Sequence, residues 1–328
     1  MINLAIKFGS NEIIVFRKGM GIVAREKTFV AMSKINRRRR IYAYGDDAVK
    51  LCLQKHTEYK LYQPIKGVEI LDKTFTKILI ERVLKKCIFE TGNICALVAV
   101  PCALSEKKLL ELKLLLKEAG INKINFVQNA VGIRMCNVKL PENAHCMVVD
   151  IGKYLMDVSV LTKHQFCTGR NYLIGGAEMD VALATYIQDN YNIFVTEQQA
   201  EQIKNEAGSL YNNDTYTINF EGLTENDTYK EITLKANEIR IAIVGVYDKM
   251  FDLIEETIDN LEPDVLAEVR KYGIVFTGGV SCIQGLIEYA KKRFDFPIMV
   301  ADNPEDAVVL GVGKLLTLKL GEFPYIEL

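Results

Sequence analysis

The stretch HCMVVDIGKYLMDVSVLTKHQFCTGRNYLIGG, residues 145–176, decides the fold that this sequence predicts. It contains short runs of branched and aromatic residues separated by Gly, Lys and Asn, which is typical of a meander of antiparallel strands. The N-terminal stretch NLAIKFGSNEIIVFRKGMGIVAREKTFVAM, residues 3–32, has the same pattern. Two similar meanders about 140 residues apart predict a duplicated architecture rather than one continuous sheet.

Each meander is followed by helix and strand patterns, so the fold class that the sequence predicts is α/β. LVAVP, residues 97–101, is a continuous apolar run, as expected of a strand covered on both faces. Ser105 is placed to cap the helix that follows, whose leucines at 109, 112 and 116 share one stripe, and Gly120 is placed to end it. Further helices are predicted over residues 175–191 and 235–261, the second ended by Pro263.

Composition excludes several classes of protein. The 328 residues carry 41 Lys and Arg against 42 Asp and Glu, a net charge of −1, which does not suggest a nucleic-acid partner. The sequence has no apolar run of about 18 residues and no signal-peptide pattern at its start, so we expect a cytoplasmic protein. None of the eight cysteines forms a Cys-x-x-Cys pair, and we expect them to be buried small hydrophobes.

Three apolar strand patterns run into glycine turns: Phe8-Gly9-Ser10, Ile151-Gly152-Lys153 and Thr277-Gly278-Gly279. A glycine turn after a strand lets backbone N–H groups approach an anion closely. One such turn is common punctuation. Two at equivalent places in the repeated meanders, and a third near the end, are better evidence of a ligand site.

Six blocks of sequence occur along the chain in this order: KGMGIVAREKTFVAM, MVVDIG, GGAEMD, AEQIKNEAGSLY, IVFTGGVSCIQGL and NPEDAVVLGVGKLL. In their order and spacing they resemble the MreB family of bacterial actins, the rod-shape-determining proteins, and the resemblance covers about residues 3 to 318. The resemblance implies an actin-like ATPase fold of two duplicated α/β domains around a nucleotide cleft that holds ATP with Mg²⁺. It also implies self-assembly into filaments that organise cell-wall synthesis under the membrane.

The resemblance also implies domain limits. Actin-like domain I would span residues 1–146, with a small inserted subdomain at about 33–63. Domain II would span residues 147–304, with an inserted subdomain at about 190–235. The C-terminal helix, residues 305–328, would return to domain I.

Site residues follow from the same resemblance, position by position. The catalytic pair would be Gln128 and Asp150, and Asp150 would also be the metal ligand. The nucleotide-binding residues would be Lys7, Gly9, Ser10, Asn11, Gly152, Lys153, Gly175, Gly176, Glu201, Lys204, Gly278, Gly279, Val280 and Ser281.

The phosphate loops depart from the family pattern. Lys7 replaces an Asp that helps to hold hydrated Mg²⁺, and a lysine repels a cation. Its ammonium would pair either with a phosphate or with Asp150 or Asp157. In the second loop Lys153-Tyr154-Leu155-Met156 replaces Gly-Gly-Thr-Thr, which places apolar bulk where a γ-phosphate would lie. Each lost charge-assisted donor is worth roughly 1.5–3 kcal/mol, so ATP binding should be weak or lost.

Three further changes bear on the site. Gln128 replaces the family's catalytic Glu; a Gln orients water but is a poor base, so the chain would be at most a slow ATPase. Ala177 replaces an Asp and Val280 replaces a Gly on the adenosine side.

Two segments raise a membrane question. The helix ending at Lys85-Lys86 runs into Ile88 and Phe89, where the family has an apolar loop that enters the bilayer. These two residues would either contact an anionic membrane surface or cover the core at the helix end. The arginine run at 37–40 would either contact an acidic partner or lipid headgroups, or be a solvated loop.

The leading hypothesis is therefore an MreB-like cytoskeletal filament protein with weakened or lost ATP binding, assembling alone or with a paralogue, at the inner face of the cell membrane. The alternatives are an active ATP-driven filament and a non-polymerising scaffold or tether. A sugar kinase on the same superfold would need an intact second phosphate loop, which this sequence lacks.

Overall fold

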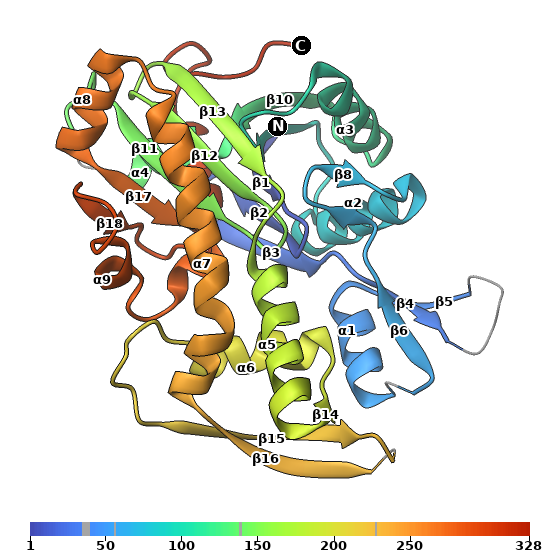
Figure 1. Ribbon diagram of the computed structural model, residues 1–328. Helices are drawn as coiled ribbons and strands as arrows, with labels where there is room; N and C mark the ends of the chain where they lie inside the picture. The colour runs from blue at the N-terminus through green and yellow to red at the C-terminus, as the bar shows by residue number, and fades with distance from the viewer. Residues whose placement is uncertain (35–39, 56, 138–139, 227) are drawn as a thin grey trace. The chain divides into compact units, whose positions relative to one another are not determined.

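The structure is a computed structural model that describes residues 1–34, 40–55, 57–137, 140–226 and 228–328 (Figure 1). Its contacts divide the chain into two compact units. Unit 1 contains Met1–Ala144, Ser159–Asn171 and Ala301–Leu328, and unit 2 contains His145–Val158 and Tyr172–Val300. The domain limits that the resemblance implies, at 146 and 304, stay a prediction.

Unit 1 is built on a five-stranded sheet of order β10-β9-β1-β2-β3. Strand β1 pairs antiparallel with β2 and parallel with β9, and β9 pairs parallel with β10. The strands and the helices that accompany them are β1 (Ile2–Phe8), β2 (Glu12–Arg17), β3 (Gly21–Lys27), β9 (Ile94–Val100), β10 (Lys123–Gln128), α2 (Lys73–Cys87), α3 (Glu106–Glu118), α4 (Asn129–Asn137) and α10 (Ala307–Leu315).

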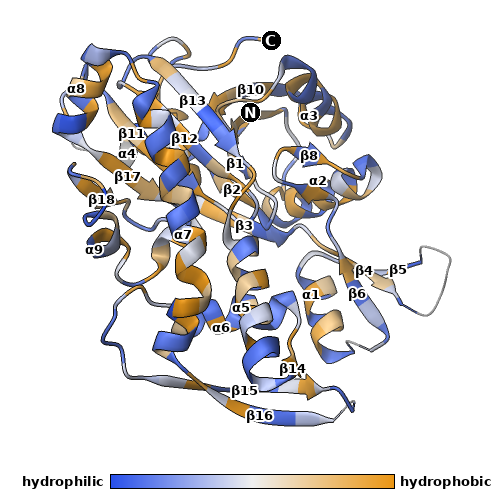
Figure 2. Cartoon of the chain, viewed as in Figure 1, coloured by the Kyte–Doolittle hydropathy of each residue, from blue (hydrophilic) through white to orange (hydrophobic). Residues whose placement is uncertain are grey.

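The main core of unit 1 lies where α2 and α3 pack on this sheet. Buried leucines at 79, 109, 112 and 116 form a cluster with strand residues such as Ile6 and Val98, and the apolar stripes of both helices are visible in Figure 2. Residues 97–100 are all buried, which confirms a strand covered on both faces. Ser105 caps α3 by accepting the N–H of Lys108, and Gly120 follows the helix with φ of 104°, as predicted.

Helices α4 and α10 cross at two glycines. A Cβ atom on Gly311 would lie 2.2 Å from the carbonyl oxygen of Gly132, and one on Gly132 would lie 2.8 Å from Val312. Only a residue without a side chain allows the two backbones to approach this closely. The contact brings the C-terminal helix onto the unit that contains β1.

A small three-stranded sheet of order β5-β4-β6 is inserted into unit 1. It has its own core of Phe29, Ala31, Ala48 and Cys52. Arg37, Arg38 and Arg39 of the arginine run lie outside the described residues, whereas the Arg40 guanidinium lies over the ring of Tyr42. The elements are β4 (Val30–Ser33), β5 (Ile41–Tyr44), α1 (Gly45–Gln54) and β6 (Tyr59–Tyr62), followed by the hairpin β7 (Ile65–Lys66) and β8 (Glu69–Ile70).

The second large sheet has the order β13-β12-β11-β17-β18, and β12 and β13 contribute residues to both units. Strand β17 lies between β11 and β18 and is parallel to both. Its strands and the helices of unit 2 are β11 (Cys146–Ile151), β12 (Met156–Leu161), β13 (Phe166–Tyr172), β17 (Ile274–Thr277), β18 (Ile298–Val300), α5 (Gly176–Tyr191), α6 (Glu197–Ala207), α7 (Ala236–Asp259), α8 (Pro263–Tyr272), η1 (Gly279–Cys282) and α9 (Leu286–Ala290).

A three-stranded sheet of order β14-β15-β16 is also part of unit 2, with β14 (Ile193–Phe194), β15 (Thr217–Thr224) and β16 (Tyr229–Lys235). The core of the unit contains an aromatic group of Tyr247, Phe251, Phe276 and Phe294. The prediction that Pro263 ends the long helix was wrong in detail. Helix α7 ends at Asp259, and Pro263 is the first residue of α8. The N–H group at that position makes no hydrogen bond within the helix, so a proline, which has no N–H, is tolerated there.

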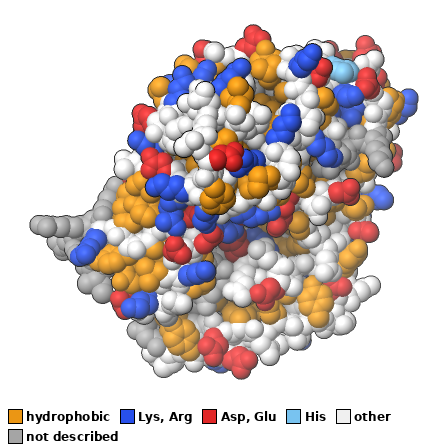
Figure 3. Space-filling view, turned by 180° about the vertical axis from the view of Figure 1, so that it is seen from behind, with side chains coloured by type: hydrophobic (Ala, Val, Ile, Leu, Met, Phe, Trp, Pro, Cys, Tyr) orange, Lys and Arg blue, Asp and Glu red, His pale blue; other side chains and the backbone are white. Residues whose placement is uncertain are grey.

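Other expectations had mixed outcomes. Cys52, Cys87 and Cys146 are buried as expected, whereas Cys282 is exposed and the exposure of three others is intermediate: Cys95, Cys102 and Cys167. Within the described ranges no helix is long and apolar enough to cross a membrane. On the face shown in Figure 3, Lys and Arg side chains are interspersed with Asp and Glu side chains.

Two glycine-to-alanine changes in helices should have opposite effects. Gly311→Ala should lower the free energy of unfolding by about 1–3 kcal/mol, since its Cβ would overlap the Gly132 carbonyl. Gly245→Ala should raise that free energy by up to about 1 kcal/mol, because this exposed position in α7 has nothing within 4 Å of the added Cβ. Urea unfolding followed by circular dichroism measures both, and equal effects of the two changes would contradict the packing described.

Candidate functional site

The carboxyl ends of three parallel strands bring two predicted site residues to one edge of the unit 1 sheet. Lys7 at the end of β1 pairs in register with Ala99, and Gln128 at the end of β10 pairs with Val100. The strand β9 that carries both partners lies between them. The carboxyl edge of a parallel sheet is the usual place for ligand-binding residues.

These two side chains have different surroundings. The Lys7 ammonium donates a hydrogen bond of 3.1 Å to the backbone carbonyl of Glu305. The Oε1 atom of Gln128 is buried and accepts no hydrogen bond from the part of the chain that is described. The pairing of Lys7 with Asp150 or Asp157 stays a prediction, as does its pairing with a phosphate.

The first glycine turn, residues 8–10, makes hydrogen bonds to other residues of unit 1. The Gly9 N–H donates to the Glu12 carbonyl at 3.2 Å, and a Cβ on Gly9 would lie 2.9 Å from the same oxygen. The Ser10 hydroxyl donates to the Gly67 carbonyl at 3.3 Å, and the Asn11 carbonyl accepts the N–H of Thr28 at 3.1 Å. The hydroxyl predicted to contact a nucleotide therefore has a partner within unit 1.

In unit 2 the second glycine turn closes on itself and on the start of α5. The Gly152 N–H donates to the Leu155 carbonyl at 2.8 Å. The carbonyls of Gly152 and Lys153 accept the N–H groups of Gly176 and Ala177 at 3.0 and 2.8 Å. Free N–H groups at a helix N-terminus favour anions, and two of those in α5 are used here by the turn.

Two glycines let the segments around this turn approach. A Cβ on Gly175 would lie 2.5 Å from the Gly152 carbonyl oxygen. Gly278, at the end of β17, has φ of 85°, and a Cβ there would lie 2.3 Å from the Ile151 carbonyl and 2.7 Å from Asp150 Oδ1. Both positions therefore require glycine for close backbone packing, whether or not a ligand binds.

Four charged side chains beside the turn form what we call the charge quartet: Lys153, Glu201, Lys204 and Asp180. The Lys153 ammonium lies 2.6 Å from Glu201 Oε2, and the Lys204 ammonium lies 2.5 Å from Asp180 Oδ1 and 3.0 Å from the Gly176 carbonyl. The Lys153, Lys204 and Asp180 side chains are 6%, 9% and 1% exposed. Glu201 and Lys204 are three residues apart, on one face of α6.

Burial of the charge quartet changes the pKa values of groups in it and beside it. Burial raises the pKa of the Asp180 carboxyl to about 6, against the opposite effect of the Lys204 ammonium. Burial also raises the pKa of the Tyr154 hydroxyl, and the carboxylates of Glu197 and Glu201 raise it further. Tyr154 therefore lies near the acidic side chains of α6. Its predicted position at a γ-phosphate stays a prediction.

The third glycine turn is anchored in the core of unit 2. Gly279 begins η1, where the Ser281 hydroxyl donates to the Thr277 carbonyl at 2.6 Å and the Val280 carbonyl accepts the Tyr247 hydroxyl at 2.9 Å. Val280 and Ser281 are both buried. A Cβ on Gly176 would lie 3.2 Å from Val280, so this turn packs directly on the start of α5.

Asp150 is buried at the end of β11, in register with Thr277 of β17. Its predicted roles, in catalysis and as a metal ligand, stay predictions. In the described ranges no group of three or more His, Cys, Asp or Glu side chains is arranged to hold a metal ion.

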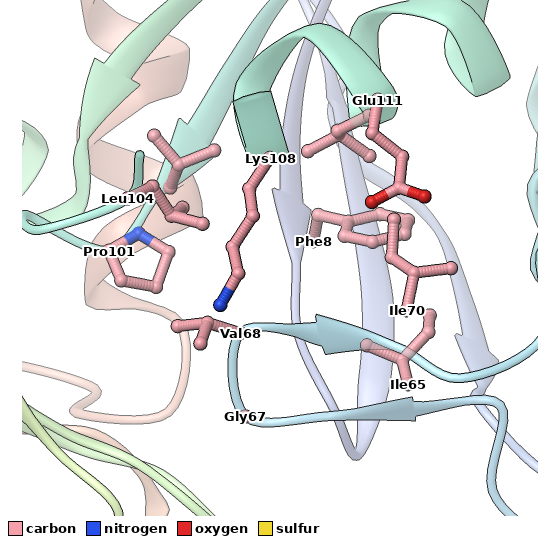
Figure 4. A pocket seen from close by; sticks show the side chains of 11 residues that line it. Phe8, Ile65, Gly67, Val68, Ile70, Pro101, Leu104, Lys108 and Glu111 are labelled. Carbon is pink, nitrogen blue, oxygen red and sulfur yellow. The ribbon is translucent and has the colours of Figure 1, made fainter. Parts of the chain in front are cut away.

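Figure 4 shows a separate apolar pocket in unit 1, with about 410 Å³ of space not occupied by atoms, part of it open to solvent. None of the predicted site residues lines it. Its charged lining residues, Lys108 and Glu111, are paired with Glu69 and Lys73. The lining residues are Phe8, Ile65, Gly67, Val68, Ile70, Val100, Pro101, Leu104, Lys108, Glu111 and Leu112.

The two predicted membrane residues differ from each other. Ile88 packs against the core of unit 1, which agrees with the expectation that it covers the helix end. Phe89 is 83% exposed, and it is followed by residues 90–93, which are also exposed.

Comparisons with known proteins identify the family of this chain. The sequence matches the family model described as MreB/Mbl protein over residues 1–320. The chain belongs to the MreB/Mbl family. The cell shape-determining protein MreB of Escherichia coli is 24% identical over 325 residues, which cover 96% of this chain and 93% of that protein. The cell shape-determining protein Mbl of Bacillus subtilis is 22% identical, covering 96% and 95%.

Solved structures show the actin-like fold of this MreB/Mbl member. MreB5 of Spiroplasma citri bound to ADP has a TM-score of 0.88 at 21% identity, covering 96% of this chain and 95% of that chain. The MamK double helical filament has a TM-score of 0.80 at 20% identity, covering 97% and 99%. The predicted fold class and family are therefore confirmed.

Sequence reasoning missed the charge quartet. The family resemblance assigns Lys153, Glu201 and Lys204 to the nucleotide one by one, and it does not predict that Lys153 pairs with Glu201 or that Lys204 pairs with Asp180. The available clue was the substitution of Lys for Gly at 153, because a lysine in a tight glycine turn needs a carboxylate partner if it is buried.

The raised pKa of Asp180 predicts a pH dependence of stability. Its pKa is about 6 in the folded protein and about 3.9 in an unfolded chain, so between these values the folded state binds the proton more readily. This carboxyl should therefore make the free energy of unfolding rise by about 2 kcal/mol as the pH falls from about 7 to about 4. Urea unfolding of wild type and Asp180→Asn across this range isolates the contribution, and parallel pH profiles would contradict it.

Proposed function

We propose that this MreB/Mbl member is a filament-forming cytoskeletal protein that acts in cell shape or cell-wall organisation, with weakened or lost ATP binding and hydrolysis. The observation that carries the proposal is the match to the whole family framework combined with altered phosphate loops. A framework retained over 96% of the chain supports the assembly role of the relatives.

The loop contacts support the second part of the proposal. Two N–H groups at the start of α5, the Ser10 hydroxyl and the Glu201 carboxylate all have partners in the chain. A nucleotide would have to replace these contacts. The charge-assisted bond between Lys153 and Glu201 is worth about 1.5–3 kcal/mol, and each of the neutral hydrogen bonds about 0.5–1.5 kcal/mol. As they stand, the residues of the second turn do not fit a triphosphate, and no hydrolytic step is assigned to Gln128 or Asp150.

The alternative is an ATP-driven filament. It is favoured by MreB5 of Spiroplasma citri, whose structures are described as bound to ADP and to AMPPNP and share the fold of this chain. In that case ATP with Mg²⁺ would bind despite the changed loops. A non-polymerising scaffold or tether would share the fold and differ only in assembly.

The proposed partners are further copies of this chain or a paralogue, in keeping with the filament described for MamK. We place the protein in the cytoplasm, at the inner face of the cell membrane. The exposed Phe89 beside Lys85 and Lys86 supports this placement, since an aromatic ring next to cations suits an anionic bilayer surface.

Electron microscopy tests the assembly role. Purified protein should form filaments without nucleotide, with ADP and with AMPPNP, because the proposed subunit needs no ligand to complete its fold. Filaments only with AMPPNP would favour the ATP-driven alternative. Monomers under all conditions, alone and with a paralogue, would remove the filament proposal.

Liposome pelleting tests the membrane contact. Ile88→Ser with Phe89→Ser should reduce pelleting with anionic vesicles, and because Ile88 belongs to the core, Phe89→Ser alone is the cleaner change. Leu173→Ser is the matched control, since Leu173 is also an exposed apolar residue, 74% exposed, but lies in unit 2. Pelleting of Phe89→Ser equal to that of wild type would sink the membrane contact.

A further inference from the structure

The Lys153 side chain takes an unexpected direction. It belongs to the second glycine turn, where the family resemblance would assign it to a phosphate. Instead its ammonium lies 2.6 Å from Glu201 Oε2 on α6, and the side chain is only 6% exposed. A lysine this deeply buried is stable only with a charged partner, so the pair is part of the folded unit and not a surface contact.

Glu201 and Lys204 are two of the residues that the family resemblance assigns to a nucleotide. Both have partners within unit 2: Glu201 binds Lys153, and Lys204 binds Asp180 and the Gly176 carbonyl. The charge quartet contains two cations and two carboxylates, so it is neutral without any ligand. The pKa of Asp180 responds to Lys153 and Glu201 as well as to Lys204, which shows that the four groups act on one another.

The backbone around Lys153 is fixed by hydrogen bonds to the start of α5. The Lys153 carbonyl accepts the Ala177 N–H and the Gly152 carbonyl accepts the Gly176 N–H, at 2.8 and 3.0 Å. The turn is thus attached to α5 by its backbone and to α6 by its side chain. A ligand that needs Glu201 must replace its charge-assisted bond to Lys153, whose side chain is 6% exposed.

We propose that Lys153 is a tethered cation that locks unit 2 in a nucleotide-free form by occupying Glu201. Lys153 is then the residue that sets the nucleotide affinity of unit 2, rather than Tyr154 of the same turn. This inference rests on the proposed function in taking ATP binding as weakened or lost, and on the family resemblance in taking Glu201 and Lys204 as residues that would face a nucleotide.

Calorimetric titration with ADP tests the lock, because ADP lacks the γ-phosphate that Tyr154 and Leu155 would exclude. Lys153→Gly, which restores the family's residue, and Lys153→Met, which keeps the aliphatic stem and removes the charge, should both bind ADP roughly tenfold or more tightly than wild type. Adding Glu201→Gln to Lys153→Met should remove most of that gain. Since Lys153→Met retains the packing volume, it keeps the test valid if the glycine variant fails to fold.

The matched control is Lys163→Met. Lys163 also pairs with a glutamate, Glu142, but this pair lies in unit 1 and has no contact with the charge quartet. Its ADP affinity should equal that of wild type.

Two results would overturn the proposal. Lys153 variants that bind ADP no more tightly than wild type, including no binding by any variant, would show that Lys153 does not block the site. Weaker binding by Lys153→Met would show that Lys153 is a phosphate ligand. Filament formation is measured separately by electron microscopy, so filaments without a gain in affinity would overturn the lock and leave the proposed function standing.

Discussion

A lysine buried in a turn that normally consists of glycines is the constraint on which unit 2 depends. Its ammonium cannot remain unpaired away from water, so the turn must lie within reach of a carboxylate, and Glu201 supplies it at 2.6 Å. Because Glu201 lies on α6 and the turn is bonded through its backbone to α5, this single pair ties three segments together. In the proposed lock, the same pair occupies the carboxylate that the family resemblance assigns to a nucleotide.

The glycines that match the MreB family have a structural explanation that does not require a ligand. Gly175 and Gly278 allow backbone segments to approach carbonyl oxygens within 2.5 Å of where a Cβ would lie, and Gly311 does the same between α4 and α10. A chain that has lost nucleotide binding would still need these residues to keep its fold. The matching glycines therefore support the family and the fold but not nucleotide binding. The residues that decide nucleotide binding in this account are Lys153 and its partner Glu201.

Sequence alone predicted the features that depend on local pattern. Helix α3 and its buried leucine stripe follow from hydrophobic periodicity over about four turns, and the Ser105 cap follows from the residue type at the start of the helix. The paired meanders follow from repeated strand patterns. Pro263 was misplaced because a proline suits the start of a helix as well as the end of the preceding one. The difference between partly buried Ile88, which packs against the core, and exposed Phe89 depends on which way each side chain turns after α2 ends, and no pattern in the sequence fixes that.

The charge quartet could not be derived in the same way. Lys153 and Glu201 are 48 residues apart, and their contact exists only once α5 and α6 pack beside the turn. The substitution of Gly by Lys showed that the loop had changed. It did not show whether the new cation would point toward a phosphate or toward a carboxylate of the same chain.

The central claim is that unit 2 is complete without a nucleotide, and the most direct measurement is the thermal unfolding of the wild-type protein with millimolar ADP or AMPPNP, with and without Mg²⁺. A ligand that binds only the folded state increases the free energy of unfolding with the logarithm of one plus the ratio of ligand concentration to Kd, and so raises the unfolding temperature. The account predicts the same unfolding temperature under all these conditions. A rise of several degrees with either nucleotide would show that the folded chain binds it, and would contradict the account.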